Sequence, residues 1–218
     1  GQFGRKQLGV DGWYQDPVRP THTTGTFTAS TPLVNGASQT GSTISTDGWA
    51  SGAATLNKGD VFTIAGVNSV NPLSYSDNGR LQQFVVTATT SDASGAMATL
   101  PISPSIITSG ALQTVSASPA NNAVITVLGA TAAAGGTLAT TTSPQSFVYH
   151  PDAFAFVMAD LMKPGAGAES TTVRSKSLGF SIRMVEQYQI GTDQNPSRLD
   201  ILIGATTIQA RLAARVWG

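Results

Sequence analysis

Residues 180–190, FSIRMVEQYQI, form the clearest strand pattern in the sequence. Phe180, Ile182 and Met184 fall on one face of an extended segment, while the residues between them fall on the other. The turn-forming residues 191–196 follow, and a second alternating segment then runs through residues 198–203. The two segments predict a β-hairpin or two neighbouring strands.

Further short strands are predicted upstream, because segments rich in Val, Ile, Phe and Thr recur at residues 60–67, 81–89, 97–102 and 123–128. Turn-forming residues separate these segments. Residues 77–79, Asp-Asn-Gly, and residues 35–36, Asn-Gly, both tolerate the positive φ of tight turns. Short strands with such punctuation predict a compact antiparallel barrel or sandwich, which we place at residues 32–128.

The rest of the chain divides around this module. Residues 129–145 are rich in Ala, Gly and Thr and predict a linker. Residues 153–161 fit either a buried strand or a helix, and their alternation of small and large side chains favours the strand. The sequence therefore predicts a β-rich α+β protein in four parts: residues 1–31, 32–128, 129–145 and 146–218.

Charge is scarce in this chain. Charged residues make up 11% of it, against about a quarter in an average globular chain, and residues 93–151 contain no Asp, Glu, Lys or Arg. Such a surface suits a protein that packs against copies of itself, or a Ser/Thr-rich β-protein facing an extracellular space. The chain carries no net charge, although residues 174–218 hold six basic side chains against three acidic ones.

Few residues could carry catalysis. The only histidines are His22 and His150, and a Ser/His/Asp arrangement with Asp152 stays open because such triads assemble in space. There is no G-x-S-x-G nucleophile elbow, no H-E-x-x-H, no calcium loop and no phosphate-binding G-x-x-x-x-G-K. Without cysteine, disulfides and thiolate metal sites are excluded. We therefore expect no enzyme activity, no cofactor, no metal site and, from the absence of a long apolar run, no membrane span.

The chain resembles the coat-protein family of podovirus-type tailed phages along nearly its whole length. Six motifs in the same order carry this resemblance, and they lie at residues 13–23, 58–68, 81–87, 102–110, 150–154 and 197–204. The resemblance implies a major capsid protein with the Hong Kong 97 fold and an inserted β-barrel domain. As a departure from the family, we expect the N-terminal arm, the extended loop and the spine helix of that fold not to be present in this sequence.

Partners and location follow from the same resemblance. It implies a homo-oligomer of pentamers and hexamers in an icosahedral shell, which encloses double-stranded DNA without reading its sequence. A scaffolding protein during assembly, a portal, assembly in the host cytoplasm and a final place in the virion are implied with it. The competing interpretation, from the low charge and the Ser/Thr content, is a secreted β-sandwich module for adhesion or glycan binding.

Five residues are candidate contacts between subunits: Asp47, Trp49, Arg183, Arg198 and Arg211. The first two lie in residues 39–51, which match by order a loop that reaches the neighbouring capsomer in this family. Trp49 is either displayed on that loop or packed over the end of the barrel, and the sequence leaves both open. The three arginines come from the basic C-terminal region, which could face DNA or the carboxylate of a neighbour.

Overall fold

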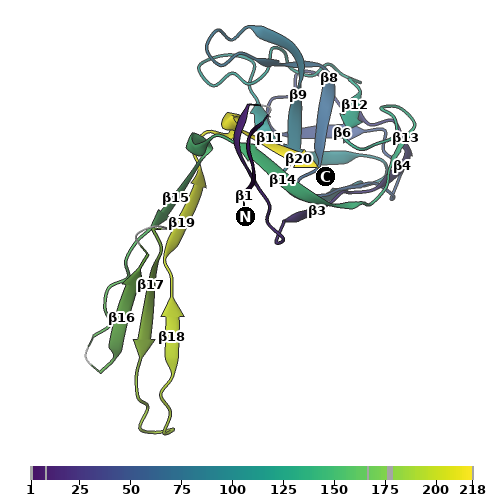
Figure 1. Ribbon diagram of the computed structural model, residues 1–218. Helices are drawn as coiled ribbons and strands as arrows, with labels where there is room; N and C mark the ends of the chain where they lie inside the picture. The colour runs from purple at the N-terminus through teal and green to yellow at the C-terminus, as the bar shows by residue number, and fades with distance from the viewer. Residues whose placement is uncertain (1, 8, 166, 176–178, 218) are drawn as a thin grey trace. The chain divides into compact units, whose positions relative to one another are not determined.

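The computed structural model describes residues 2–7, 9–165, 167–175 and 179–217. Their regular structure is almost entirely β-strand, apart from two 3-10 segments, η1 (Pro151–Ala153) and η2 (Ala210–Leu212) (Figure 1). The chain divides into two compact units. We call Pro17–Gln145 the barrel unit and residues 2–16 with Ser146–Val216 the strand unit. No α-helix occurs in the described residues, so the α component expected from the sequence is absent from them.

The barrel unit contains twelve strands or parts of strands. They are β3 (Thr21–Thr23), β4 (Phe27–Ser30), β5 (Leu33–Val34), β6 (Gly41–Asp47), β7 (Thr55–Leu56), β8 (Val61–Val70), β9 (Asp77–Val86), β10 (Thr90–Ser91), β11 (Met97–Ile106), β12 (Ile125–Val127), β13 (Gly136–Leu138) and the first part of β14 (Thr142–Tyr149). Six of them form one antiparallel sheet in the order β12-β8-β9-β11-β6-β5. A bridge between Leu33 and Val124 joins the two edges of this sheet. The sheet therefore closes into a barrel.

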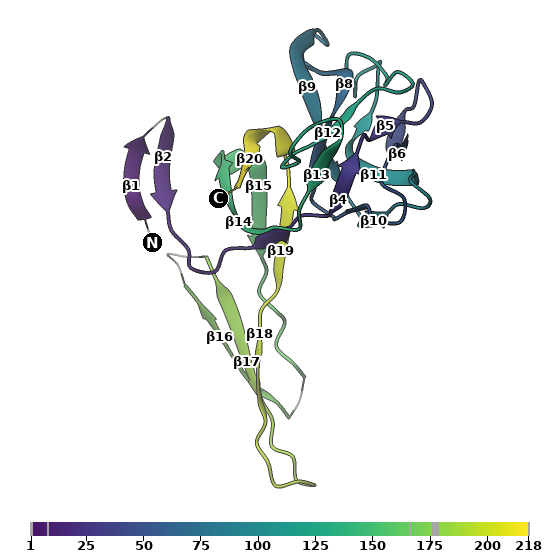
Figure 2. The same ribbon diagram turned by 90° about the vertical axis from the view of Figure 1, so that its right-hand side faces the viewer.

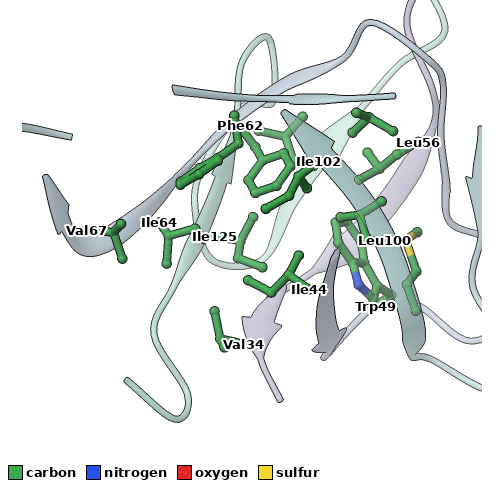
Figure 3. Packing of buried hydrophobic residues seen from close by; sticks show 14 of the residues in the cluster. Val34, Ile44, Trp49, Leu56, Phe62, Ile64, Val67, Leu100, Ile102 and Ile125 are labelled. Atoms are coloured by element: carbon green, nitrogen blue, oxygen red, sulfur yellow. The ribbon is translucent and has the colours of Figure 1, made fainter. Parts of the chain in front are cut away.

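The interior of the barrel is filled by apolar side chains that project inward from alternate strand positions. Phe62 on β8 faces Phe84 on β9, and their rings stack with centroids 5.8 Å apart. Figure 3 shows how side chains from several strands and the loop around Trp49 meet in this core. The largest fully buried side chains are Phe27, Phe62, Phe84, Ile44, Leu56, Ile64, Met97, Leu100, Ile106, Ile125, Leu138 and Val34.

The compact unit is wider than the module placed at residues 32–128. Phe27 and Leu138 both lie outside that range, and both are buried in the same core. They enter it because β4 pairs with β13, with Phe27 opposite Leu138. Residues 129–145, which the composition predicts to be a linker, thus supply one strand of the unit and begin another.

The predicted strands at residues 60–67, 81–89, 97–102 and 123–128 appear as β8, β9, β11 and β12. The turn predicted at residues 77–79 is wrong. The chain reverses earlier, where the Asn71 N–H donates to the Ser76 carbonyl at 2.9 Å, and Asp77 already begins β9. Gly79, at φ +69°, instead lies where the pairing of β8 with β9 shifts register.

The strand unit consists of small sheets. Its strands are β1 (Gln2–Gln7), β2 (Val10–Tyr14), the second part of β14, β15 (Phe154–Met158), β16 (Glu169–Arg174), β17 (Ser181–Glu186), β18 (Ser197–Asp200), β19 (Ile203–Thr207) and β20 (Ala213–Trp217). β1 pairs with β2, β15 with β19, β20 with β14, and β16, β17 and β18 form a three-stranded sheet. The predicted neighbouring strands of residues 180–190 and 198–203 are confirmed as β17 and β18, and β15 confirms the strand at residues 153–161.

The two units differ sharply in how much apolar surface they bury. The core belongs to the barrel unit, whereas Ala153 is the one fully buried apolar residue of the strand unit among those whose burial is described. An isolated two-stranded sheet is at best marginally stable in water, and independent stability needs three or more strands with an apolar face or packing against another element. Among the described residues, no helix is long and apolar enough to cross a membrane.

Candidate assembly surface

The sheet β16-β17-β18 has one apolar face. Figures 1 and 2 show its three strands side by side. Met184 on β17 is paired with Leu199 on β18, and Ile182 is paired with Val173 on β16. Directly opposed residues of antiparallel strands point to the same side of a sheet, so these four side chains share one face. All four are exposed, from 38% for Met184 to 70% for Leu199.

Two aromatic rings extend this face. Phe180, just before β17, lies on the same side by alternation, and its ring meets that of Phe156 on β15 edge-to-face, with centroids 6.2 Å apart. Both rings are still about half exposed. We define the apolar face by six residues: Phe156, Val173, Phe180, Ile182, Met184 and Leu199.

The apolar face is unusual for a protein that stays alone in water. Single exposed apolar residues are common, but a contiguous group of large ones marks a surface that binds protein or membrane. Here the group lies on a thin sheet that has little apolar burial of its own. Covering it would both remove apolar area from water and stabilise the sheet.

The opposite face of the same sheet is polar. Arg183 lies between Thr172 and Asp200 in the register, and its guanidinium bonds the Asp200 carboxylate at 2.5 Å. It also donates to the Met162 carbonyl. Arg198 bonds the other oxygen of Asp200 at 2.8 Å. Arg183 and Arg198 are thus both engaged within their own sheet, although the Arg198 side chain remains 71% exposed.

These arginines lower the pKa of Asp200, chiefly through the Arg183 hydrogen bond and then through that of Arg198. Because the pKa of Asp200 is lowered, its charged carboxylate stabilises the folded sheet at any pH above the ordinary carboxyl pKa, which is about 4. That contribution is lost as the pH falls through the lowered pKa. We expect Arg183→Gln to return the pKa of Asp200 further toward its ordinary value than Arg198→Gln does. Carboxyl chemical shifts followed through an acid titration measure this, and an equal or reversed effect would contradict the assignment.

The other three candidate contacts lie elsewhere. Asp47 ends β6 and is half-buried opposite Leu33, so residues 41–47 of the expected loop are a barrel strand. Trp49 is only 4% exposed and packs edge-to-face on Phe27, with ring centroids 5.4 Å apart. Of the two interpretations that the sequence left open for this ring, the structure therefore has the packed one. Arg211 is exposed on η2.

The polar edge of Trp49 has a buried partner. Its indole Nε1 donates to the Thr46 hydroxyl at 2.9 Å, and Thr46 is fully buried. Thr46→Val keeps the shape but leaves the indole N–H without this acceptor, which we expect to cost about 1–3 kcal/mol of unfolding free energy. Thr43→Val, at an exposed position of the same strand, should change stability by less than about 0.5 kcal/mol. Denaturant unfolding compares the two, and equal effects would contradict this role of Thr46.

A second exposed apolar group lies on the barrel unit, at the reversal between β8 and β9. Leu73 is 89% exposed there, and Leu112 in the loop after β11 is 77% exposed. The two loops are joined by the Tyr75 hydroxyl, which donates to the Ala111 carbonyl at 3.3 Å. Neither this group nor the apolar face was recognised from the sequence, although the alternation in residues 180–190 already places Ile182 and Met184 on one side.

The histidines have structural contacts. His22 Nε2 lies 2.9 Å from Asp60 Oδ1 in the interior of the barrel unit. His150 Nδ1 accepts a hydrogen bond from the Asp152 backbone N–H at 3.2 Å, capping η1, and both side chains are exposed. Within the described residues, no group of three or more His, Asp or Glu side chains could hold a metal ion.

Comparisons with known proteins identify the family. No curated protein matches the sequence. A solved structure described as the CUS-3 coat protein I-domain is similar at 30% identity, with 46% of this chain and 96% of that chain covered and a TM-score of 0.33. The sequence model of the P22 coat protein family, gene protein 5, matches residues 15–214. The chain therefore belongs to the P22 coat protein family and is a structural protein of the phage capsid.

Proposed function

We propose that this protein is the major capsid subunit that forms pentamers and hexamers of an icosahedral shell around double-stranded DNA. The apolar face of β16-β17-β18 carries the proposal, because it gathers exposed large apolar side chains on strands with little core of their own. In the shell, coat-protein polypeptide covers this face. Each contact can be modest, since a closed shell repeats the same contact many times.

The body of the subunit is proposed to have the Hong Kong 97 fold, with the barrel unit as its inserted domain. The order of the chain supports this arrangement. The strand unit is built from residues 2–16 and Ser146–Val216, and the whole barrel unit lies between them in sequence. The N-terminal arm, extended loop and spine helix of that fold have no counterpart among the described strands.

The role proposed for the subunit is structural and not enzymatic. Shell formation occurs in the host cytoplasm with a scaffolding protein, and the shell carries a portal and encloses DNA. Zero net charge supports an inner surface that does not hold DNA strongly. The engagement of Arg183 and Arg198 by Asp200 supports the same conclusion, because it offsets part of their charge. No membrane is involved.

Sedimentation velocity and negative-stain electron microscopy of the full-length protein that carries this sequence test the proposal. We expect capsomers or closed particles of uniform diameter. A protein that stays monomeric at every concentration, and that binds glycans on an array, would instead be the secreted adhesion module. The family match favours the capsid subunit over that alternative.

A further inference from the structure

A buried carboxylate just before β8 gathers three hydrogen-bond donors from two different segments. Asp60 is 1% exposed. Its Oδ2 accepts from the Gly25 backbone N–H at 2.9 Å and from the Asn57 backbone N–H at 2.7 Å, while its Oδ1 lies 2.9 Å from His22 Nε2. Gly25 and His22 belong to the segment that leads into the barrel. One carboxylate of the barrel thus holds that segment at two points.

The neighbouring turn holds the same segment. The Asn57 side-chain amide donates to the carbonyls of Thr23 and Thr24, both at 3.1 Å. Gly25 packs tightly against the Thr55 backbone. A Cβ atom added to Gly25 would lie 2.0 Å from the Thr55 carbonyl oxygen. We call residues 20–25 the incoming connector. It is fixed by hydrogen bonds and by close packing together.

The incoming connector is in turn joined to the segment that leaves the barrel, residues 139–145, which we call the outgoing connector. The Thr24 N–H donates to the Thr141 carbonyl at 3.0 Å, and the Thr24 hydroxyl accepts from the Thr141 N–H at 2.9 Å. Near the other end, the Gln145 N–H donates to the Pro20 carbonyl at 2.8 Å. Whatever holds one connector therefore restrains both.

We propose that Asp60, with His22 and Asn57, is a latch that fixes both connectors to the barrel, so that barrel and connectors move as one body. The latch thus keeps residues 20–25 and 139–145 with the barrel, up to the positions at which the two compact units divide. The latch is a property of the barrel unit itself and does not depend on shell formation. Its loss frees the connectors before it unfolds the barrel.

Asp92 provides a matched control. Its carboxylate also accepts three backbone N–H groups of the barrel unit, from Gly52, Ala54 and Gly95 at 2.7–2.9 Å. These hydrogen bonds lower the pKa of Asp92, the one from Ala54 most of all. None of the three donors belongs to a connector. Asp60→Asn and Asp92→Asn therefore each remove a carboxylate that accepts three hydrogen bonds, but only Asp60 belongs to the latch.

Amide hydrogen exchange of the full-length chain, resolved by residue, tests the latch. In Asp60→Asn we expect the amides of Thr24, Gly25, Thr141 and Gln145 to exchange at least about tenfold faster, because a hydrogen bond to a charged group stabilises by roughly that factor or more. The amides of β6 and β11 should keep their wild-type rates. Asp92→Asn should leave both connectors unchanged.

The latch is wrong if Asp60→Asn accelerates exchange equally throughout the barrel unit, or leaves the connectors at wild-type rates. If Asp60→Asn does not fold, His22→Phe replaces it, since the ring keeps much of the volume and removes one partner of Asp60. In His22→Phe, faster amide exchange that is confined to the two connectors, even if less than tenfold, supports the latch. Uniform acceleration or none in His22→Phe overturns it.

Discussion

Replacing Gly25 by alanine is expected to destabilise the barrel unit by more than about 3 kcal/mol. The new methyl group would lie 2.0 Å from the Thr55 carbonyl oxygen and 2.9 Å from the Leu56 Cα. Both are backbone atoms and cannot rotate away as the end of a flexible side chain can. The change should also separate Thr26 from Thr55, which exchange two backbone hydrogen bonds of 2.8 Å.

Equilibrium unfolding in guanidinium chloride, followed by tryptophan fluorescence, measures this effect, since Trp49 is buried in the same core. Thr28→Ala, at an exposed position three residues away, is the control and should change stability by less than about 0.5 kcal/mol. A Gly25→Ala protein as stable as Thr28→Ala would show that the close approach of the two segments is not rigid.

Replacing Met184 by aspartate is expected to abolish the formation of closed particles. Met184 lies on the central strand of the apolar face, where its side chain is still 38% exposed. If coat protein covers this face in the shell, the new carboxylate is buried without a partner, which costs several kcal/mol at each contact. Repetition of that contact over the shell multiplies the effect. Particle yield, measured by sedimentation, reports it.

Thr172→Asp is the matched control, because Thr172 lies on the polar face of the same sheet, opposite Arg183. A carboxylate there meets a guanidinium and remains near water, so particle yield should stay close to wild type. Equal loss of particles in both variants would mean that any added charge prevents assembly. Wild-type yield for Met184→Asp would remove the apolar face from the shell contacts.

Strand positions could be predicted well from the sequence because side-chain alternation is a local property. The pairing of residues 180–190 with residues 198–203 followed from alternation and an intervening turn, and β17 and β18 have that pairing. Barrel closure could not be predicted in the same way. It depends on the bridge between Leu33 and Val124, which are far apart in sequence and carry no local signal.

The surroundings of the candidate contact residues also could not be predicted from the sequence. Arg183 and Arg198 were chosen for their charge, but the register places both beside Asp200, which composition does not reveal. Trp49 was open to two interpretations because a ring flanked by small residues suits either a loop or a core. The hydrogen-bond acceptor of its indole N–H, Thr46, lies only three residues away, yet the Thr46 side chain could be placed inside the barrel only after the strands were known.

Cryo-electron microscopy of the assembled particle, at a resolution that shows side chains, tests whether the apolar face is a contact of the shell. We expect coat-protein atoms to cover Val173, Ile182, Met184 and Leu199, so that all four are buried in the shell although they are exposed in the single chain. A shell in which these four side chains face solvent or DNA would contradict it.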